Sequence, residues 1–133
     1  RIKPFPGIQN LLIDLKSKGF KFSLYTGRGR PSTENMLIGL GLSDFFEVIV
    51  TGSDVKVGKP HPEGIQKIVV SQDKSLFCMI GDSPADIAAA SSAGIRSIGV
   101  YWDEYSDQKK LAAQNPTAIF GTVAELADFL QSI

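Results

Sequence analysis

The chain alternates between segments with helical spacing of apolar residues and short apolar segments typical of strands. The first helix-like segment has apolar residues at Ile8, Leu11, Leu12 and Leu15, and Gly19 ends it before the strand-like sequence FKFSLYT. The same pattern repeats to the C-terminus. Further helices are predicted over 31–42, 61–72, 84–94, 106–114 and 122–133, and further strands over 46–52, 75–81, 95–101 and 117–121.

This alternation indicates β-α-β units with right-handed crossovers, and therefore a mostly parallel sheet with helices on both faces. The length of 133 residues suits one domain, and no linker, repeat or low-complexity segment divides it. We therefore predict one α/β domain over residues 1–133, a three-layer α/β/α sandwich of Rossmann-like type.

Composition excludes several classes of partner. Lys plus Arg equals Asp plus Glu, at 14 residues each, so net charge favours neither nucleic acid nor an anionic membrane. No apolar run approaches the roughly 20 residues that span a bilayer, and the N-terminus has no signal-peptide pattern. We expect a soluble, cytoplasmic protein.

The only cysteine, Cys78, excludes an internal disulfide, and its apolar neighbours predict a buried structural thiol.

Polar residues follow the ends of four predicted strands, where parallel sheets bind their ligands. Lys59, in the loop DVKVGKPHPEG, can reach the same edge of the sheet. We therefore expect hydroxyl groups, a lysine and carboxylates to lie together at this edge of the sheet. The clusters are 26–28, 51–53, 81–83 and 101–104.

Asp82 and Asp86 lie four residues apart around Pro84, and two interpretations remain open. Asp, Ser and Pro are common at helix starts, so the pair can be a cap and a partner of the helix dipole. Two carboxylates at a strand end can also share Mg2+. With a hydroxyl and Lys59 nearby, such an edge suits the charge of a phosphoryl group.

The segments LYTGR, GKPHPEG and IGDSPADIAAASSAGI resemble the second, third and fourth motifs of the haloacid dehalogenase-like (HAD-like) hydrolases, particularly the phosphoglycolate-phosphatase-like members. The opening segment, 4–26, also resembles the entry into their core. The most specific part is GDSPADI followed by AAASSAGI. The order of the motifs agrees, with 33 positions from Thr26 to Lys59 and 23 from Lys59 to Asp82.

The resemblance implies a Mg2+-dependent phosphatase that acts on a small phosphorylated metabolite through an aspartyl-phosphate. Thr26, with Gly27, would bind the transferred phosphoryl group. Lys59 would hold the phosphate and the carboxylate of the nucleophile, and Asp82 and Asp86 would hold Mg2+. Two residues would support the site, namely Ser83 and Arg28.

The chain departs from the family at the nucleophile. The family's Asp-x-Asp-x-Thr motif is absent, and Asp14, the only aspartate before Thr26, lies within a predicted helix. In the family this motif ends the first core strand, which lies between the strands that end at Thr26 and Asp82. We therefore expect a gap between these two strands. We also expect residues 1–133 to be the C-terminal part of a longer protein, with the nucleophile strand and any cap domain outside them.

Alternatives remain. If 133 residues were the whole chain, it would be a non-catalytic phosphate- or metal-binding domain, because no aspartyl-phosphate can form. A phosphoacceptor signalling domain needs its acidic pair before the threonine and the lysine, and here the pair follows them. Dehalogenase activity is disfavoured, because a metal and carboxylates assist phosphoryl transfer. His61 lies in a turn before a helix, which disfavours a catalytic role. The sequence assigns no oligomeric state.

Overall fold

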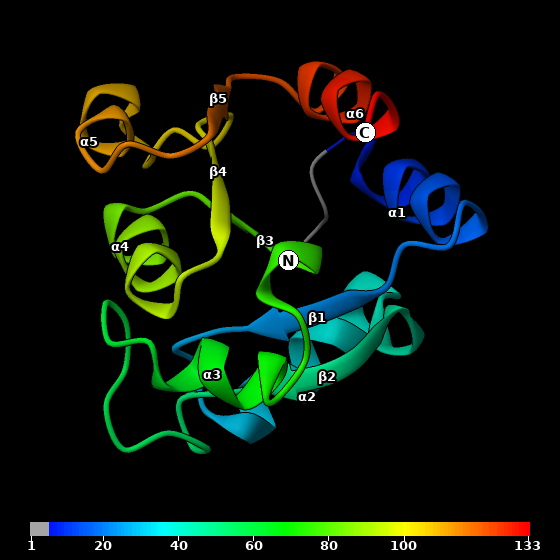
Figure 1. Ribbon diagram of the computed structural model, residues 1–133. Coiled ribbons are helices and arrows are strands. Elements are labelled where there is room, and N and C mark those ends of the chain that lie inside the picture. Colours follow the sequence, from blue (N-terminus) through cyan, green and yellow to red (C-terminus); the bar gives the residue numbers. More distant parts are fainter. Residues whose placement is uncertain (1–5) are drawn as a thin grey trace.

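The computed structural model describes residues 6–133, and its helices and strands alternate along the chain as the sequence predicts (Figure 1). The helices are α1 (Ile8–Ser17), α2 (Arg30–Leu40), α3 (Glu63–Val69), α4 (Pro84–Ala93), α5 (Gln108–Ala112) and α6 (Val123–Gln131). The strands are β1 (Phe22–Tyr25), β2 (Phe46–Val50), β3 (Cys78–Gly81), β4 (Arg96–Val100) and β5 (Ala118–Phe120). Two short 3-10 helices, η1 (Ser43–Phe45) and η2 (Lys74–Leu76), precede β2 and β3.

The strands form two separate parallel sheets. β1 pairs with β2, and β3, β4 and β5 pair in that order. Neither β1 nor β3 has a partner on its remaining edge within the described residues. These are the strands that lead to Thr26 and Asp82, so the gap expected from the sequence is present. The α/β class with parallel strands is confirmed.

Helices on both faces join the two sheets across this gap. On one face, a hydrophobic core cluster combines Tyr25 and Val50 of the first sheet with Ile65 of α3 and Ala89 of α4. On the other face, Leu11 and Leu15 of α1 pack with side chains of β4 and α6. Figure 1 shows α3 and α4 on one side of the strands and α1 and α6 on the other. The outer layers are therefore continuous, while the middle layer is divided.

Local sequence explains how α4 begins and ends next to β3. The Ser83 hydroxyl accepts a hydrogen bond from the Asp86 N–H, and the Asp86 carboxylate accepts one from the Ser83 N–H, which makes a capping box. Pro84 occupies the first turn, and Gly94 ends the helix with φ of 78°. Thr122 caps α6: its hydroxyl oxygen accepts from the Glu125 N–H at 3.2 Å, and its O–H donates to the Glu125 carboxylate at 3.0 Å.

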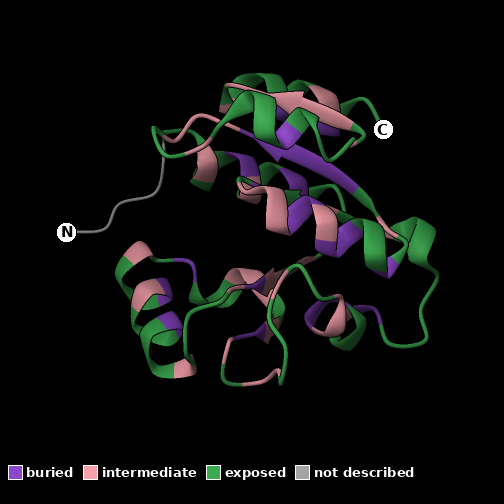
Figure 2. Ribbon diagram, turned by 90° about the vertical axis from the view of Figure 1, so that its left-hand side faces the viewer, coloured by how far each residue is buried: buried purple, intermediate pink, exposed green. Residues whose placement is uncertain are grey.

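The division of the sheet leaves β3 unusually exposed. A parallel strand with helices on both faces is normally buried throughout, and residues 97–100 of β4 follow that rule (Figure 2). In β3, however, Cys78 and Ile80 are exposed. The prediction of a buried Cys78 thiol was therefore wrong for this structure. The apolar run is a strand as expected, but the strand has an open edge.

Among residues 6–133, the structure contains no helix that combines the length and the apolar character needed to cross a bilayer.

Candidate functional site

An ion pair between Lys59 and Asp86 connects the two sheets at the ends of their strands. Lys59 lies in the loop after β2, and its Nζ is 2.6 Å from Oδ1 of Asp86 in the first turn of α4. Both side chains are largely enclosed, with 20% of Lys59 and 7% of Asp86 exposed. Of the ion pairs found among the described residues, this one alone joins the two halves.

Asp86 uses its second carboxylate oxygen to organise the turn after β3. Oδ2 accepts hydrogen bonds from the N–H groups of Asp82 and Ser83, at 3.1 and 3.2 Å. A Cβ on Gly81 would overlap the Asp86 side chain, so glycine is the residue that fits here. The helix-start interpretation of Asp86 is thus correct. The same carboxylate also forms the ion pair with Lys59, an interaction that helix capping alone does not require.

The Asp82 carboxylate lies at the same edge of the sheet and, unlike that of Asp86, takes no part in the capping box. Burial by the surrounding protein raises the pKa of Asp82, and the negative charges of Asp86 and then Asp103 raise it further. Asp103 follows β4, in one of the polar clusters that the sequence placed at the same edge. A cation at Asp82 would oppose these effects. Among residues 6–133, however, no three carboxylate, histidine or cysteine side chains cluster closely enough to form a metal site by themselves.

Thr26, Gly27 and Arg28 form a second group, at the end of β1. The Thr26 N–H donates to Val50 of β2, and the Thr26 hydroxyl oxygen accepts from the Arg28 N–H at 3.2 Å. The Arg28 guanidinium donates to Ser32 at 3.3 Å. A Cβ on Gly52 would overlap the Gly27 backbone, so two strand-end loops pack directly together.

Lys59 also links this second group to the first. Its Nζ lies 5.0 Å from the centre of the Tyr25 ring, and Tyr25 immediately precedes Thr26. The structure therefore brings Lys59, Asp86, Asp82 and Ser83 together, with the Thr26 group on the β1 side of the gap.

Two carboxylates that the site prediction omitted shape the loop that carries Lys59. Oδ2 of Asp54 accepts from the Thr51 N–H and hydroxyl, both at 2.8 Å, and from Arg30 at 2.6 Å. These hydrogen bonds, with Arg30 first, lower the pKa of Asp54 to about 2. Glu63 accepts from the N–H groups of Lys56 and Val57, which lowers its pKa. A Thr-x-x-Asp turn directly after a strand was the available signal for Asp54.

His61 has a local role, as the sequence suggested. Its Nδ1 accepts from the Glu63 N–H at 3.1 Å, at the start of α3, and its side chain is exposed.

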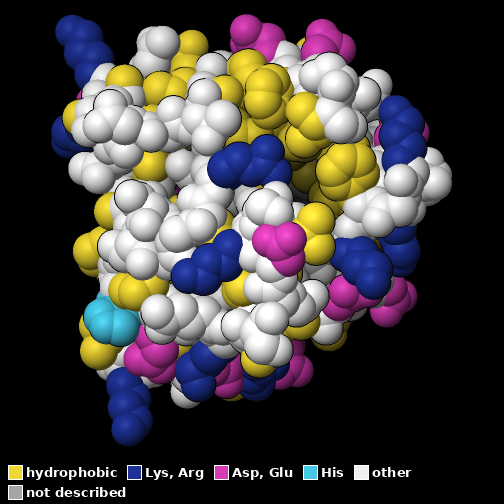
Figure 3. All heavy atoms as spheres, viewed as in Figure 1, with side chains coloured by type: hydrophobic (Ala, Val, Ile, Leu, Met, Phe, Trp, Pro, Cys, Tyr) yellow, Lys and Arg dark blue, Asp and Glu magenta, His cyan; other side chains and the backbone are white. Residues whose placement is uncertain are grey.

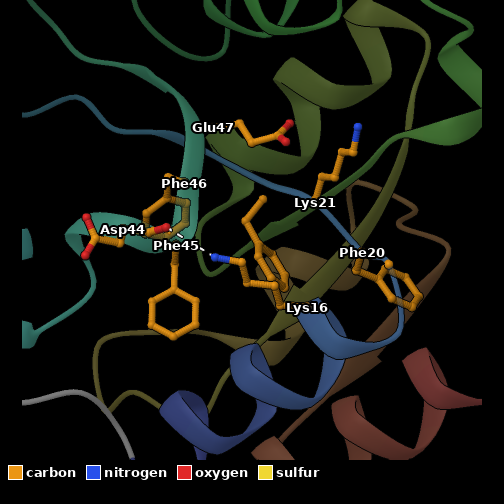
Figure 4. Close-up of a pocket in the computed structure, with 9 residues that line it drawn as sticks. Lys16, Phe20, Lys21, Asp44, Phe45, Phe46 and Glu47 are labelled. Carbon is orange, nitrogen blue, oxygen red and sulfur yellow. Dashed lines mark hydrogen bonds between the residues drawn. The ribbon is translucent and has the colours of Figure 1, made fainter.

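A separate cavity of about 290 Å³ lies at the opposite ends of β1 and β2 (Figure 4). Lys16 lies 5.5 Å from the centre of the Phe45 ring and donates to the Asp44 carbonyl at 3.5 Å. This cavity borders the amino ends of the strands, whereas ligands of parallel sheets bind at the carboxyl ends. We therefore place the functional site at the Lys59–Asp86 edge.

Comparison with known proteins identifies the family of the chain. Residues 1–100 match the model of the family described as haloacid dehalogenase-like hydrolase. The chain is 35% identical over 133 residues to the phosphoglycolate phosphatase of Yersinia pestis, covering 97% of this chain and 55% of that protein. It is 29% identical over 134 residues to the pyrophosphatase PpaX of Bacillus mycoides, covering 99% of this chain and 62% of that protein.

Solved structures show the same fold. A candidate β-phosphoglucomutase of Thermotoga maritima superimposes with a TM-score of 0.89 at 30% identity, over 98% of this chain and 61% of that one. A haloacid dehalogenase-like hydrolase of Streptococcus pneumoniae gives a TM-score of 0.82 at 23% identity, over 96% and 60% of the two chains. The chain thus spans only part of the length of these relatives. It belongs to the haloacid dehalogenase-like hydrolase family and resembles its phosphoglycolate-phosphatase-like members.

Proposed function

We propose that this chain is the C-terminal part of the catalytic core of a Mg2+-dependent phosphatase acting on a small phosphorylated metabolite. The observation that carries the proposal is the Lys59–Asp86 ion pair, which holds an ammonium group at the carboxyl ends of the strands. The names of the relatives, a phosphoglycolate phosphatase and a pyrophosphatase, support a phosphorylated substrate.

Lys59 and Thr26 have the hydrogen-bonding capacity that a phosphoryl group needs. An ammonium group has three N–H donors, and Asp86 uses one of those of Lys59. The other two remain for phosphate oxygens and for an incoming carboxylate. The Thr26 oxygen accepts from Arg28, so its own O–H remains available as a donor to phosphate. These donors would balance the charge that develops during transfer.

Asp82 and Asp86 fit a Mg2+ ion that completes its shell with water and substrate oxygens, because this ion commonly takes only one or two protein carboxylates. A bound Mg2+ would polarise the phosphoryl oxygens and neutralise their charge. Burial first, and then the charges of Asp86 and Asp103, raise the pKa of Asp82, and a bound cation would offset these effects. Within these residues, Asp82 would be the main ligand and Asp86 a supporting one.

The nucleophile would come from a segment outside residues 1–133. Its carboxylate oxygen would attack phosphorus in line, the P–O bond to the leaving alcohol would break, and water would then hydrolyse the acyl phosphate. Lys59 would orient that carboxylate while holding the phosphate. The gap between β1 and β3 supports this proposal, because it lies between Thr26 and Asp82.

The test is hydrolysis of p-nitrophenyl phosphate by the full-length protein, with Mg2+ and with Mg2+ removed by a chelator. We expect turnover only with Mg2+, and we expect Lys59→Met or Asp82→Asn to lower kcat by about 100-fold or more. Glu34→Gln, in an exposed ion pair of α2, is the matched control and should leave the rate unchanged. Absence of Mg2+-dependent turnover in the full-length protein would overturn the proposal. It would favour the alternative of a non-catalytic domain, which titration with phosphate and Mg2+ would then test.

A further inference from the structure

We propose that Arg30 and Asp54 are positioning residues for phosphoryl transfer. Thr26 follows β1 and Lys59 lies in the loop after β2, so their separation depends on how these two segments are held together. The Arg30–Asp54 ion pair fixes this separation, and it acts through the backbone of both segments rather than on the phosphoryl group itself. The assignment rests on the proposed function, because a fixed separation matters only if Thr26 and Lys59 act on one phosphoryl group.

Backbone contacts connect Thr26 to the loop that carries Lys59. The Gly52 N–H donates to the Arg28 carbonyl at 2.7 Å. A Cβ on Gly52 would overlap the Gly27 backbone, so the two segments lie in direct contact. Because the Arg28 N–H donates to the Thr26 hydroxyl oxygen, these contacts extend to the residue that we assign to the phosphoryl group. The position of Thr26 therefore depends on the position of the loop after β2.

Arg30, the first residue of α2, adds a charged contact between the same two segments. Its Nη2 donates to Oδ2 of Asp54 at 2.6 Å and to the Ile49 carbonyl of β2 at 3.1 Å. Its backbone N–H donates to the Ser53 hydroxyl at 3.0 Å. A hydrogen bond between two charged groups is stronger than a neutral one, and the planar guanidinium fixes its direction. One residue thus holds the start of α2 against the loop after β2.

Asp54 is kept ionised and in place by its neighbours. The Thr51 N–H and hydroxyl both donate to the carboxylate oxygen that also accepts from Arg30, and Thr51 is fully buried. The hydrogen bond from Arg30, followed by those from Thr51, lowers the pKa of Asp54 to about 2. The carboxylate is therefore charged near neutral pH, and a buried residue fixes where it lies.

Lys59 lies between two carboxylates that hold the backbone of its loop. Asp54 holds the loop on the side of β2. Glu63, at the start of α3, accepts from the N–H groups of Lys56 and Val57 at 3.0 and 3.2 Å. Because the loop is held on both sides of Lys59, a displacement of Asp54 displaces Lys59 as well.

The Arg30–Asp54 pair lies at the surface, outside the enclosed Lys59–Asp86 pair. The Arg30 side chain is 40% exposed and that of Asp54 is 32% exposed. Figure 3 shows basic and acidic side chains gathered along the lower border of the molecule, where Figure 1 places α2 and the loop after β2. Substitutions of Arg30 and Asp54 therefore leave the hydrophobic core unchanged, and their effects on turnover can be measured in a folded protein.

The first test is hydrolysis of p-nitrophenyl phosphate by the full-length protein with Mg2+. We expect Asp54→Ala to lower kcat by about 10- to 100-fold and to change KM by less than about 3-fold, because the reacting groups are misplaced but still present. Asp54→Asn keeps an acceptor oxygen and should recover part of the lost kcat. Arg30→Ala should show the same loss as Asp54→Ala, and it keeps the test available if Asp54→Ala does not fold. A wild-type kcat in Arg30→Ala would overturn the proposal. A rise in KM alone would also overturn it, because it would indicate direct binding of substrate.

The second test asks whether Arg30 and Asp54 act as one unit. The variant that combines Arg30→Ala with Asp54→Ala should have a kcat no lower than that of the worse single variant. Losses that multiply in the double variant would overturn the proposal. Glu34→Gln is the matched control, because it removes the other carboxylate near Arg30, at 3.9 Å within α2, and should leave kcat unchanged. Ile98→Val, in the buried part of β4, controls for lost stability and should also keep the wild-type kcat.

The failure of this proposal is distinguishable from the failure of the proposed function. Absence of Mg2+-dependent hydrolysis by the wild-type protein would reject the phosphatase, and the positioning role with it. Hydrolysis by the wild type together with an unchanged kcat in Arg30→Ala would reject the positioning role and retain the phosphatase.

Discussion

Replacing Lys59 by methionine removes the ion pair that joins the two halves while keeping most of the side-chain volume. Loss of one partner of a buried pair costs about 3–5 kcal/mol, because the other charge stays buried. Asp86 is 7% exposed but keeps two N–H donors, from Asp82 and Ser83. We therefore expect a loss at the low end of this range, about 3 kcal/mol in the free energy of unfolding.

The assay is urea unfolding of the full-length protein followed by circular dichroism. Glu34→Gln is the control, since the Arg30–Glu34 pair is 3.9 Å long with side chains 40% and 56% exposed, and its loss should cost less than about 0.5 kcal/mol. A Lys59→Met, Asp86→Asn double variant should be less destabilised than the sum of the single changes, with a coupling of at least about 1 kcal/mol. Equal effects of Lys59→Met and Glu34→Gln, or strict additivity in the double variant, would refute the reasoning.

Two further predictions concern the loops around the site. Asp54→Asn should reduce stability most near neutral pH. The lowered pKa of Asp54 means that its contribution is full above its ordinary value of 3.8 and disappears as pH falls toward about 2, so the wild type and the variant should converge in acid unfolding curves. A difference that stays constant over that range would contradict this. Gly81→Ala should cost about 1–3 kcal/mol, because its Cβ meets the Asp86 side chain, whereas Gly39→Ala meets open space and should not destabilise α2. Equal unfolding midpoints for the two variants would show that the turn after β3 has room to adjust.

The sequence predicts the order of elements well, because apolar spacing and glycine stops are local signals. The helix-like spacing from Ile8 to Leu15 and the strand ending at Gly81 both appear in the structure. The break between β1 and β3 could also be expected, but only through the resemblance to a family whose first strand is absent here. Periodicity does not say which strands pair, since pairing depends on contacts between distant segments.

The candidate site was less predictable where one residue has two partners. Asp86 was assigned either to a helix cap or to a Mg2+ site. The structure shows the cap, through Ser83, and also an ion pair with Lys59 that neither interpretation named. The Thr51 partner of Asp54 is local and could have been found, whereas its Arg30 partner lies in α2, 24 positions away, and could not. Cys78 was expected to be buried because its neighbours are apolar, and its exposure follows from the edge of β3 that is unpaired among the described residues, which its own sequence does not indicate.

The central claim is that the site of these residues is completed by a carboxylate outside them. Rapid quenching of the full-length protein during turnover of a phosphorylated substrate, followed by mapping of the acid-stable phosphoryl label by mass spectrometry, tests it most directly. The account predicts an acyl phosphate on an aspartate that precedes residue 1, and loss of its formation in Lys59→Met. A label on a residue within 1–133, or Mg2+-dependent turnover in Lys59→Met at the wild-type rate, would contradict it.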